Sequence, residues 1–389
     1  MKKIFLKKVF VVFMYVIILN ISKNKIFGEN IIDKNFVKVN VPAAVVMDAE
    51  SGRVLFDKNA DEKRKMASLT KIMTSIMLVE NCDMDEVIEV PAEATWIGGS
   101  EVGLKKGDKV TARSLLYGML LPSGNDCAYT VGLHIGGTIQ NFAQMMNKKA
   151  KELGLVNTSF ANPHGLDDEN HYTTAKEMAI ITKYAIKNKY INQAMKTKSE
   201  TINFGSFSKL LTNTNALLRT YEYTDGGKTG FTNGANRCLV STATKNGERY
   251  IAVVLGAENT QIRFNTAREI LEKSFERYNR MNISKYLNFY INIPVIKGNI
   301  KRYERKYEDN LSLPLTQKEY DNIYIKQNVN SDIMPPMYIG EKIGDIEVYI
   351  EDEIIYKKEI LLDQNIYQKT VIDYIKEELK VMFRPFEII

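Results

Sequence analysis

The sequence predicts an α+β protein in which one antiparallel sheet is flanked by helices and is followed by a smaller, C-terminal all-β domain. Two observations lead to this fold class. Strand-like segments stand near both ends of the first 280 residues, with helical patterns between them. After about residue 279 the pattern changes to short alternating segments separated by turns, which is typical of β-structure.

The larger region, residues 35–280, contains the predicted sheet and its helices. Apolar, strand-like segments at 43–48 and 52–57 open it, and two more at 236–244 and 249–256 stand near its end. Helical patterns follow Ser68 and recur over 112–121, 126–134, 139–153, 174–187 and 262–278. Because the strands come from both ends of the region, we expect them to pair in one antiparallel sheet, with the helices against it.

The smaller region, residues 288–365, is predicted to be all-β. Apolar and polar residues alternate in 291–295 and again in 345–350, and turns separate these segments. The region contains no arrangement of side chains that indicates chemistry. We therefore expect a spacer or an interaction module.

Three short motifs carry the chemistry, and the first is Ser68-Leu69-Thr70-Lys71. A serine hydroxyl must lose its proton as it attacks a carbonyl, and a spacing of three places Lys71 beside Ser68 on one helix face. The apolar run that follows predicts a buried helix. Burial, the helix N-terminus and the second cation Lys228 would all disfavour a charged Lys71 and lower its pKa. Lys71 could then act as the base; the alternative is a surface lysine.

The second motif, Ser123-Gly124-Asn125, lies in a turn-rich stretch between apolar segments. The Ser123 hydroxyl can relay a proton between Lys71 and a leaving amine, and the Asn125 amide can both donate to and accept from a peptide. The alternative is a polar helix cap formed by Ser123, Asn125 or Asp126. Both roles are compatible.

The third motif is Lys228-Thr229-Gly230, which follows two glycines and precedes Phe231. Glycines at these positions allow close approach of another backbone, as at a sheet edge that accepts a substrate strand. Lys228 and Thr229 would offer a cation and a hydroxyl to a carboxylate. We expect the backbone N–H groups of Ser68 and Phe231 to form an oxyanion hole. A plain hairpin turn would explain the glycines but not the Lys-Thr pair.

Motifs of this kind, in this order and 55 and 105 residues apart, are typical of β-lactamases and penicillin-binding proteins. The chain resembles the low-molecular-mass penicillin-binding proteins, specifically the serine-type D-alanyl-D-alanine carboxypeptidases. Further segments that carry the resemblance are 44–56, 99–108 and 162–166, and it extends from about Val41 to about Tyr278. Arg263 stands where the family has an arginine near the substrate carboxylate.

The resemblance implies a β-lactamase/transpeptidase-like fold and removal of the terminal D-alanine from peptidoglycan stem peptides. Ser68 would form the acyl-enzyme, with Lys71, Ser123, Asn125 and Lys228 as further catalytic residues. The resemblance also implies inhibition by β-lactams, which would acylate the same serine. The substrate would contact the residues Lys228, Thr229, Gly230, Phe231 and Arg263.

Other functions fit less well. A β-lactamase is disfavoured because no Glu-x-x-x-Asn segment supplies a deacylating carboxylate and because the second motif is Ser-Gly-Asn. A weakly catalytic penicillin-binding or wall-binding protein remains the alternative from another class, and a DD-endopeptidase the alternative within the same chemistry. The intact motifs favour the carboxypeptidase.

No metal and no cofactor are expected. The sequence has neither the H-E-x-x-H zinc motif nor the G-x-S-x-G motif of other serine hydrolases. His164 and His171 follow a turn at Asn162-Pro163, and we interpret them as loop residues rather than metal ligands. Among the three cysteines, Cys127 and Cys238 stand close to motifs. They are either a pair near the site or, as we expect, small buried residues.

The chain begins as an exported protein does. Residues 1–28 combine early lysines with an apolar run from 9 to 21, which predicts a secretory signal peptide or an uncleaved N-terminal anchor. Six lysines in this segment account for the whole net charge of +6, so the remainder is formally neutral. A neutral protein gives no reason to expect nucleic-acid binding. We expect an extracytoplasmic protein at the cell wall or the outer face of the cytoplasmic membrane.

The tail, residues 370–389, is predicted to be an amphipathic helix. Val371, Ile375, Leu379 and Met382 share one face, with charged residues opposite. The tail is formally neutral, so anionic lipid would attract it little. Two interpretations remain open, namely anchoring to the membrane surface and packing against the β domain.

Overall fold

The structure is a computed structural model that describes residues 31–382. The predicted leader, 1–28, and the last seven residues of the tail lie outside the described residues. None of the helices in the described part of the chain combines the length and the apolar character that a membrane span requires.

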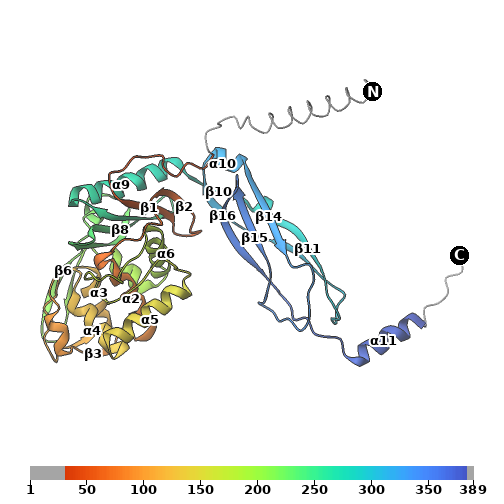
Figure 1. Cartoon of the computed structure of the whole chain (residues 1–389), viewed down its shortest axis with the longest axis horizontal. Coiled ribbons are helices and arrows are strands. Elements are labelled where there is room, and N and C mark those ends of the chain that lie inside the picture. Colours follow the sequence, from red (N-terminus) through yellow and green to blue (C-terminus); the bar gives the residue numbers. More distant parts are fainter. Residues whose placement is uncertain (1–30, 383–389) are drawn as a thin grey trace, which may run out of the picture. The chain divides into compact units, whose positions relative to one another are not determined.

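A five-stranded antiparallel sheet forms the centre of the larger region (Figure 1), and its strand order is β2-β1-β9-β8-β7. The strands are β1 (Ala43–Asp48), β2 (Val54–Lys58), β7 (Thr224–Thr232), β8 (Asn236–Lys245) and β9 (Glu248–Ala257). The N-terminal strand β1 pairs with β9, as in the register Val45↔Val253. Strands from both ends of the region therefore meet in one sheet, and the predicted fold class is confirmed.

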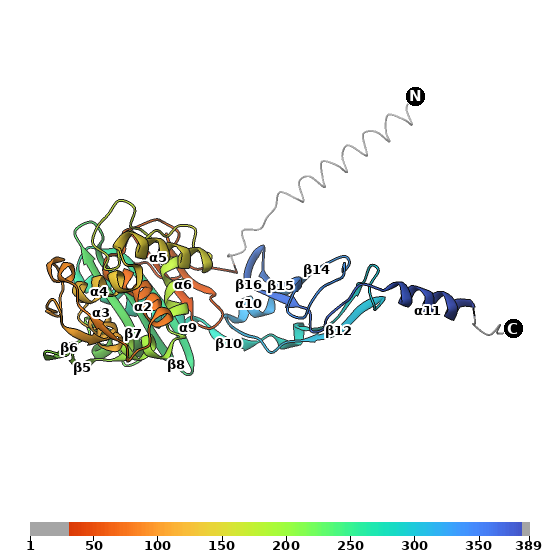
Figure 2. The same ribbon diagram turned by 90° about the horizontal axis from the view of Figure 1, so that it is seen from below.

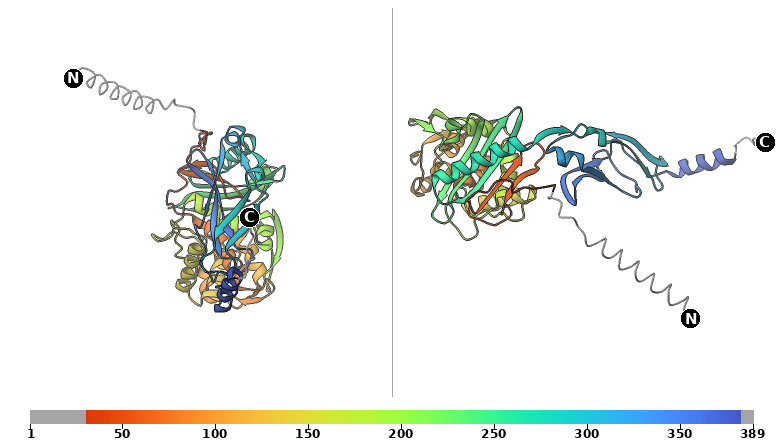
Figure 3. Two further views of the ribbon diagram at one scale, coloured as in Figure 1. Left: turned by 90° about the vertical axis from the view of Figure 1, so that its right-hand side faces the viewer. Right: turned by 90° about the horizontal axis from the view of Figure 1, so that it is seen from above.

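Alternation along the strands divides the core into two layers. Val253 and Leu255 of β9 belong to one apolar cluster, whereas Ala252 and Val254 belong to the other. The first cluster packs against α2 (Thr70–Asn81), α3 (Ala112–Leu120), α4 (Asn125–Gly136), α5 (Ile139–Glu152), α6 (Ala175–Ala185) and α7 (Lys189–Lys196). The second packs against α9 (Thr260–Arg277), which lies along one face of the sheet (Figure 3). Successive side chains of a strand point to opposite faces of a sheet, so the two clusters lie on opposite faces. Helices therefore cover this sheet on both sides.

Some elements were not predicted. These are the short helices α7 and α8 (Leu217–Thr220), the hairpin of β3 (Val87–Glu89) with β4 (Lys109–Thr111), and that of β5 (Ser199–Asn203) with β6 (Ser208–Thr212). Each is too short to give a clear periodicity, and α7 is marked mainly by its Asn188 cap. The second predicted strand begins at Val54 rather than residue 52 because Gly52 has a left-handed φ of 82° and forms the turn.

The C-terminal region is built from antiparallel β-structure, with β14, β15 and β16 side by side in Figure 2. Its elements are β10 (Asn279–Asn282), β11 (Asn288–Pro294), β12 (Arg302–Glu308), β13 (Ser312–Leu315), α10 (Gln317–Asp321), β14 (Ile323–Val329), β15 (Lys342–Ile350) and β16 (Glu353–Leu361). The predicted alternating segments fall on β11 and β15, where Ile291, Ile293 and Ile346 are buried in one core and Val348 is also buried. β10 pairs with β13, so the β-structure that follows α9 begins at Asn279, before residue 288 where the all-β region was predicted to start.

The described part of the tail forms one helix, α11 (Val371–Met382). Its apolar side chains stay exposed, by 74% at Val371 and 54% at Ile375. Thr370 and Asp373 cap its start through hydrogen bonds. The predicted amphipathic helix is present, and its apolar face is not covered within the described residues.

Candidate active site

The turn that carries Ser68 lies at the entrance to α2. A short 3-10 helix, η1 (Ala67–Leu69), leads into α2, so Ser68 and Lys71 stand one turn apart. Ala67 has a φ of 49°, a left-handed conformation that a residue with a side chain adopts only at a cost. This turn leaves Ser68 half-buried, with its Oγ 2.9 Å from Lys71 Nζ.

The Lys71 amine is fully buried and contacts three oxygen atoms. Besides Ser68 Oγ, Nζ lies 2.7 Å from Asn125 Oδ1 and 2.8 Å from the carbonyl oxygen of His164. The amide of Asn125 is oriented by its other end, because Nδ2 donates to the carbonyl of Gly98 at 2.7 Å. Two of the three partners of Lys71 are therefore acceptors only, and Ser68 alone can donate.

This arrangement suits a neutral amine. A neutral amine has two N–H groups, which the Asn125 and His164 oxygens would accept, and one lone pair, which would face the Ser68 hydroxyl. Burial lowers the pKa of Lys71 to about 7, although the nearby Asp126 carboxylate acts in the opposite direction. The pKa of Lys71 is therefore lowered as predicted, and burial is the cause. The alternative, that Lys71 is a surface lysine, is excluded.

The loop 162–166 closes on the Ser68 turn. Gly165 has a φ of 95°, and a Cβ there would lie 2.0 Å from the carbonyl oxygen of Ala67. Asn162 Oδ1 accepts from the Gly165 N–H at 2.7 Å and so fixes the loop. This close approach holds the His164 carbonyl within reach of Lys71, a contact that the sequence analysis did not predict.

His164 and His171 lie in loops, as expected. His171 Nδ1 accepts from the Ala161 N–H, and its Nε2 is 2.6 Å from the Thr70 hydroxyl, which itself donates to the Ala67 carbonyl. Burial lowers the pKa of His164 to about 3 and that of His171 to about 4. Both are neutral at physiological pH, and they support the Ser68 turn rather than transfer its proton.

Ser123 and Asn125 approach from the connection between α3 and α4. Ser123 is 6% exposed and has a φ of 73°, a second strained position at this site. The helix cap that we considered for this motif is not formed, because the N-cap of α4 is Gly124 and no side chain caps it. Asp126 instead accepts from the N–H groups of Val102, Gly103 and Leu104, and thereby holds that loop against α4.

Lys228, Thr229 and Gly230 lie on β7, which is the edge strand of the sheet. The motif is therefore part of a strand and not a hairpin turn. A Cβ at Gly230 would lie 3.1 Å from the Ser68 backbone nitrogen, so the glycine allows β7 to pack directly against the Ser68 turn. Phe231, which follows, is 52% exposed.

Two buried basic side chains, Lys228 and Arg263, lie beside this edge strand. Lys228 is fully buried and donates to the Thr229 carbonyl at 2.7 Å, and Arg263 Nη1 is 3.5 Å from the Gly230 carbonyl. Arg263 Nε is buried without a hydrogen-bond partner. Burial, Lys71 and Arg263 lower the pKa of Lys228 well below its usual value. Within the described residues, no carboxylate forms an ion pair with Lys228 or Arg263.

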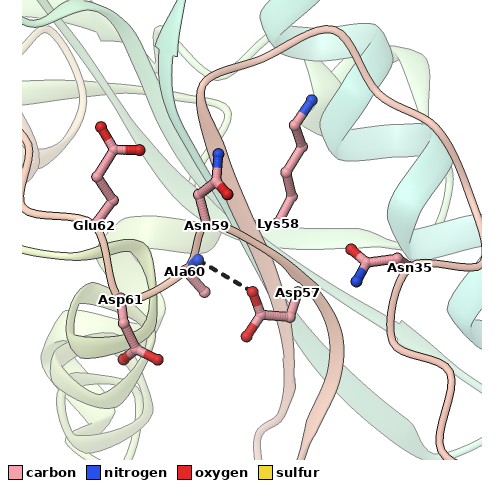
Figure 4. A pocket seen from close by; sticks show the side chains of 7 residues that line it. All are labelled: Asn35, Asp57, Lys58, Asn59, Ala60, Asp61 and Glu62. Carbon is pink, nitrogen blue, oxygen red and sulfur yellow. Dashed lines mark hydrogen bonds between the residues drawn. The ribbon is translucent and has the colours of Figure 1, made fainter.

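Cys127 and Cys238 are both free thiols and both fully buried. They are therefore not paired, in agreement with the role of small buried residues. A separate polar hollow lies at the end of β2 (Figure 4), where the Ala60 N–H donates to Asp57 Oδ1. It is lined by Asn35, Asp57, Lys58, Asn59, Ala60, Asp61 and Glu62, and it contains none of the motif residues.

The antiparallel sheet flanked by helices, with its serine beside a buried lysine and an edge strand, defines the class of this protein as a serine peptidase that works by acyl transfer. Comparison with known proteins gives the family. The family model described as D-alanyl-D-alanine carboxypeptidase matches residues 31–259, and that described as penicillin-binding protein 5, C-terminal domain, matches residues 288–368. The chain belongs to the D-alanyl-D-alanine carboxypeptidase family.

Individual relatives are similar to this protein over most of its length. The D-alanyl-D-alanine carboxypeptidase DacF of Bacillus subtilis is 32% identical over 345 residues, which are 87% of this chain and 88% of the relative. DacC of Escherichia coli is 31% identical over 84% of each. The crystal structure of penicillin-binding protein 5 from Haemophilus influenzae superposes with a TM-score of 0.71 at 25% identity, covering 85% of this chain and 99% of that one.

The close approach at Gly165 leads to a testable prediction. In the variant Gly165→Ala, the new Cβ would collide with the Ala67 carbonyl and displace the Ser68 turn. A displacement of about 1 Å at reacting groups costs roughly 100-fold in rate, so covalent labelling by a fluorescent penicillin should slow by about that factor.

The matched control is Gly154→Ala. Gly154 also has a left-handed φ, 75°, but a Cβ there would have no neighbour within 4 Å. This variant should lose about 1 kcal/mol of stability from backbone strain and be labelled normally. Labelling of a folded Gly165→Ala protein at the normal rate would show that the loop does not position Ser68.

Proposed function

We propose that this protein removes the terminal D-alanine from peptidoglycan stem peptides that end in D-Ala-D-Ala, through an acyl-enzyme on Ser68. The observation that carries the proposal is the environment of the Lys71 amine. Asn125 Oδ1 and the His164 carbonyl can only accept, so Ser68, 2.9 Å away, is the one of the three partners that can give a proton to the amine. A buried amine with a pKa of about 7 is well matched to a general base.

In the first step, Ser68 Oγ attacks the carbonyl carbon of the penultimate D-alanine while its proton passes to Lys71 Nζ. The carbonyl oxygen becomes an oxyanion, for which the Ser68 and Phe231 N–H groups are the proposed donors. The contact of Gly230 with the Ser68 turn supports this assignment, because it brings the two backbones together. The amine product, free D-alanine, needs a proton when the C–N bond breaks.

Ser123 is the proposed route for that proton. It is buried in the connection between α3 and α4, and its left-handed backbone is a strained conformation of the kind that clusters at functional sites. Lys71 would return its proton to the leaving nitrogen through the Ser123 hydroxyl. Water then attacks the acyl-enzyme with Lys71 again as the base, which releases the shortened peptide and restores Ser68.

The positive groups beside β7 are proposed to bind the carboxylate of the terminal D-alanine. Lys228 supplies a buried amine, Thr229 a hydroxyl and Arg263 a cation, and a bound carboxylate would favour the protonated form of Lys228. Thr229 Oγ1 is 2.6 Å from the Thr214 hydroxyl, which fixes its direction. A free carboxylate in this position would distinguish a carboxypeptidase from an enzyme that cuts inside a peptide.

β-Lactams are proposed as covalent inhibitors that acylate Ser68 in place of the dipeptide. The protein is proposed to be exported and to work at the cell wall or the outer face of the cytoplasmic membrane. The exposed apolar face of α11 supports attachment of the tail to the membrane surface. Peptidoglycan is then the neighbouring substrate.

The function is tested with protein from residue 29 onward and a soluble peptide ending in Lys-D-Ala-D-Ala. We expect D-alanine release that penicillin blocks, and loss of both release and penicillin labelling in Ser68→Ala. Covalent penicillin binding without D-alanine release would instead identify a DD-endopeptidase or a weakly catalytic binding protein. If neither occurs, the assignment of the three motifs is wrong.

The pKa of Lys71 sets the expected pH dependence. Below pH 7 the amine is protonated and cannot accept from Ser68, so the acylation rate should fall about tenfold per pH unit there and level off above it. The control is Lys183→Met, because burial also lowers the pKa of Lys183, which lies outside the site. Its pH profile should match the unmodified protein. An acylation rate that does not change between pH 5 and pH 8 would exclude Lys71 as the base.

A further inference from the structure

Three potential metal ligands of different chemistry converge away from the active site. Cys82, Glu86 and His134 place one sulphur, one carboxylate oxygen and one ring nitrogen within 4.8 Å of one another. Within the described residues, no other group of three such side chains meets this condition. His134 Nε2 and Glu86 Oε1 are 2.9 Å apart, so two of the ligand atoms already touch.

The three residues come from separate elements. Cys82 is the C-cap of α2, Glu86 stands just before β3, and His134 lies in the last turn of α4. The side chains of Glu86 and His134 are 37% and 33% exposed, and Cys82 is partly exposed, so solvent can reach the cluster. The sequence analysis missed the cluster because His134 is 48 residues from Glu86 and no short spacing motif joins them.

This donor set matches Zn²⁺. Zn²⁺ binds thiolate sulphur at about 2.3 Å and imidazole nitrogen or carboxylate oxygen at about 2.0–2.2 Å, in tetrahedral geometry. Ligand atoms at those distances lie about 3.5 Å apart, which small side-chain rotations reach from the separations present here. Three protein ligands leave the fourth position to water.

We propose that Cys82, Glu86 and His134 bind one Zn²⁺ ion. On binding, the Cys82 thiol gives its proton to solvent and its sulphur bonds to the metal. His134 Nε2 gives up the proton that it donates to Glu86, which passes to Nδ1 or to solvent, and two bonds to the metal replace this hydrogen bond.

The position of this site indicates a structural role. α2 carries Lys71 near its start and Cys82 at its end, and α4 carries Asn125 at its start and His134 in its last turn. At 1.5 Å of rise per residue, Cys82 is about 17 Å from Lys71, too far for the metal to contact the reacting atoms. The ion would join the far ends of the two helices whose near ends hold the catalytic amine, and so fix one helix against the other.

The test is Zn²⁺ titration of the metal-free full chain by calorimetry. We expect one ion per chain, and binding weaker by about 100-fold or more in each of Cys82→Ser, Glu86→Gln and His134→Gln. Zn²⁺ should raise the melting temperature of the unmodified protein and not that of these variants. Acylation by penicillin should be unchanged on removal of the metal at moderate temperature.

The matched control is Asp85→Asn, an acidic neighbour of the cluster that pairs with Arg113 and contributes no ligand. It should bind Zn²⁺ as the unmodified protein does. A measurement without variants uses Co²⁺ in place of Zn²⁺, for which a thiolate charge-transfer band would show that sulphur binds the metal. No binding, binding that survives in all three variants, or a Co²⁺ spectrum without that band would overturn the proposal and leave an ordinary ion pair between Glu86 and His134.

Discussion

The burial of one lysine amine is the constraint on which the site depends. Lys71 lies out of contact with water, and three parts of the chain supply its partners: the Ser68 turn, the start of α4 and the loop 162–166. A buried charged amine would be costly without a carboxylate, whereas a neutral amine is satisfied by two acceptors and one hydroxyl. The same contacts hold the amine 2.9 Å from Ser68 Oγ, the proposed nucleophile.

The backbone around the Ser68 turn and Lys71 is strained and closely packed. Ala67 and Ser123 have left-handed backbones although they are not glycines; Ala67 precedes Ser68, and Ser123 is the first residue of the second motif. Gly165 lets its loop approach the Ser68 turn more closely than any side chain would permit, and a Cβ at Gly230 would make a tight contact with that turn. Such positions cost folding free energy, which the two apolar layers around the sheet offset. The sheet and helices therefore act as a rigid support for the strained backbone at Ala67 and Ser123.

The sequence was sufficient for the fold class, and it identified most residues of the candidate site, for a chemical reason. Ser68, Lys71, Asn125 and Lys228 are recognisable because their side-chain types and order are tied to one reaction. The His164 carbonyl was not predictable, since a backbone oxygen has no residue type that marks its role. The cluster around Cys82 was missed for a related reason, because only folding brings its members together.

The central claim is that Lys71 is a neutral amine near physiological pH, and titration of Lys71 itself tests this claim most directly. Isotope-labelled lysine side chains would be followed by NMR across the pH range, with Lys71→Ala used to assign the signal. The account predicts a midpoint at about 7, well below the usual 10.5, because burial disfavours the ammonium. A midpoint near 10.5 would contradict it, since Lys71 would then be charged and unable to take the proton of Ser68.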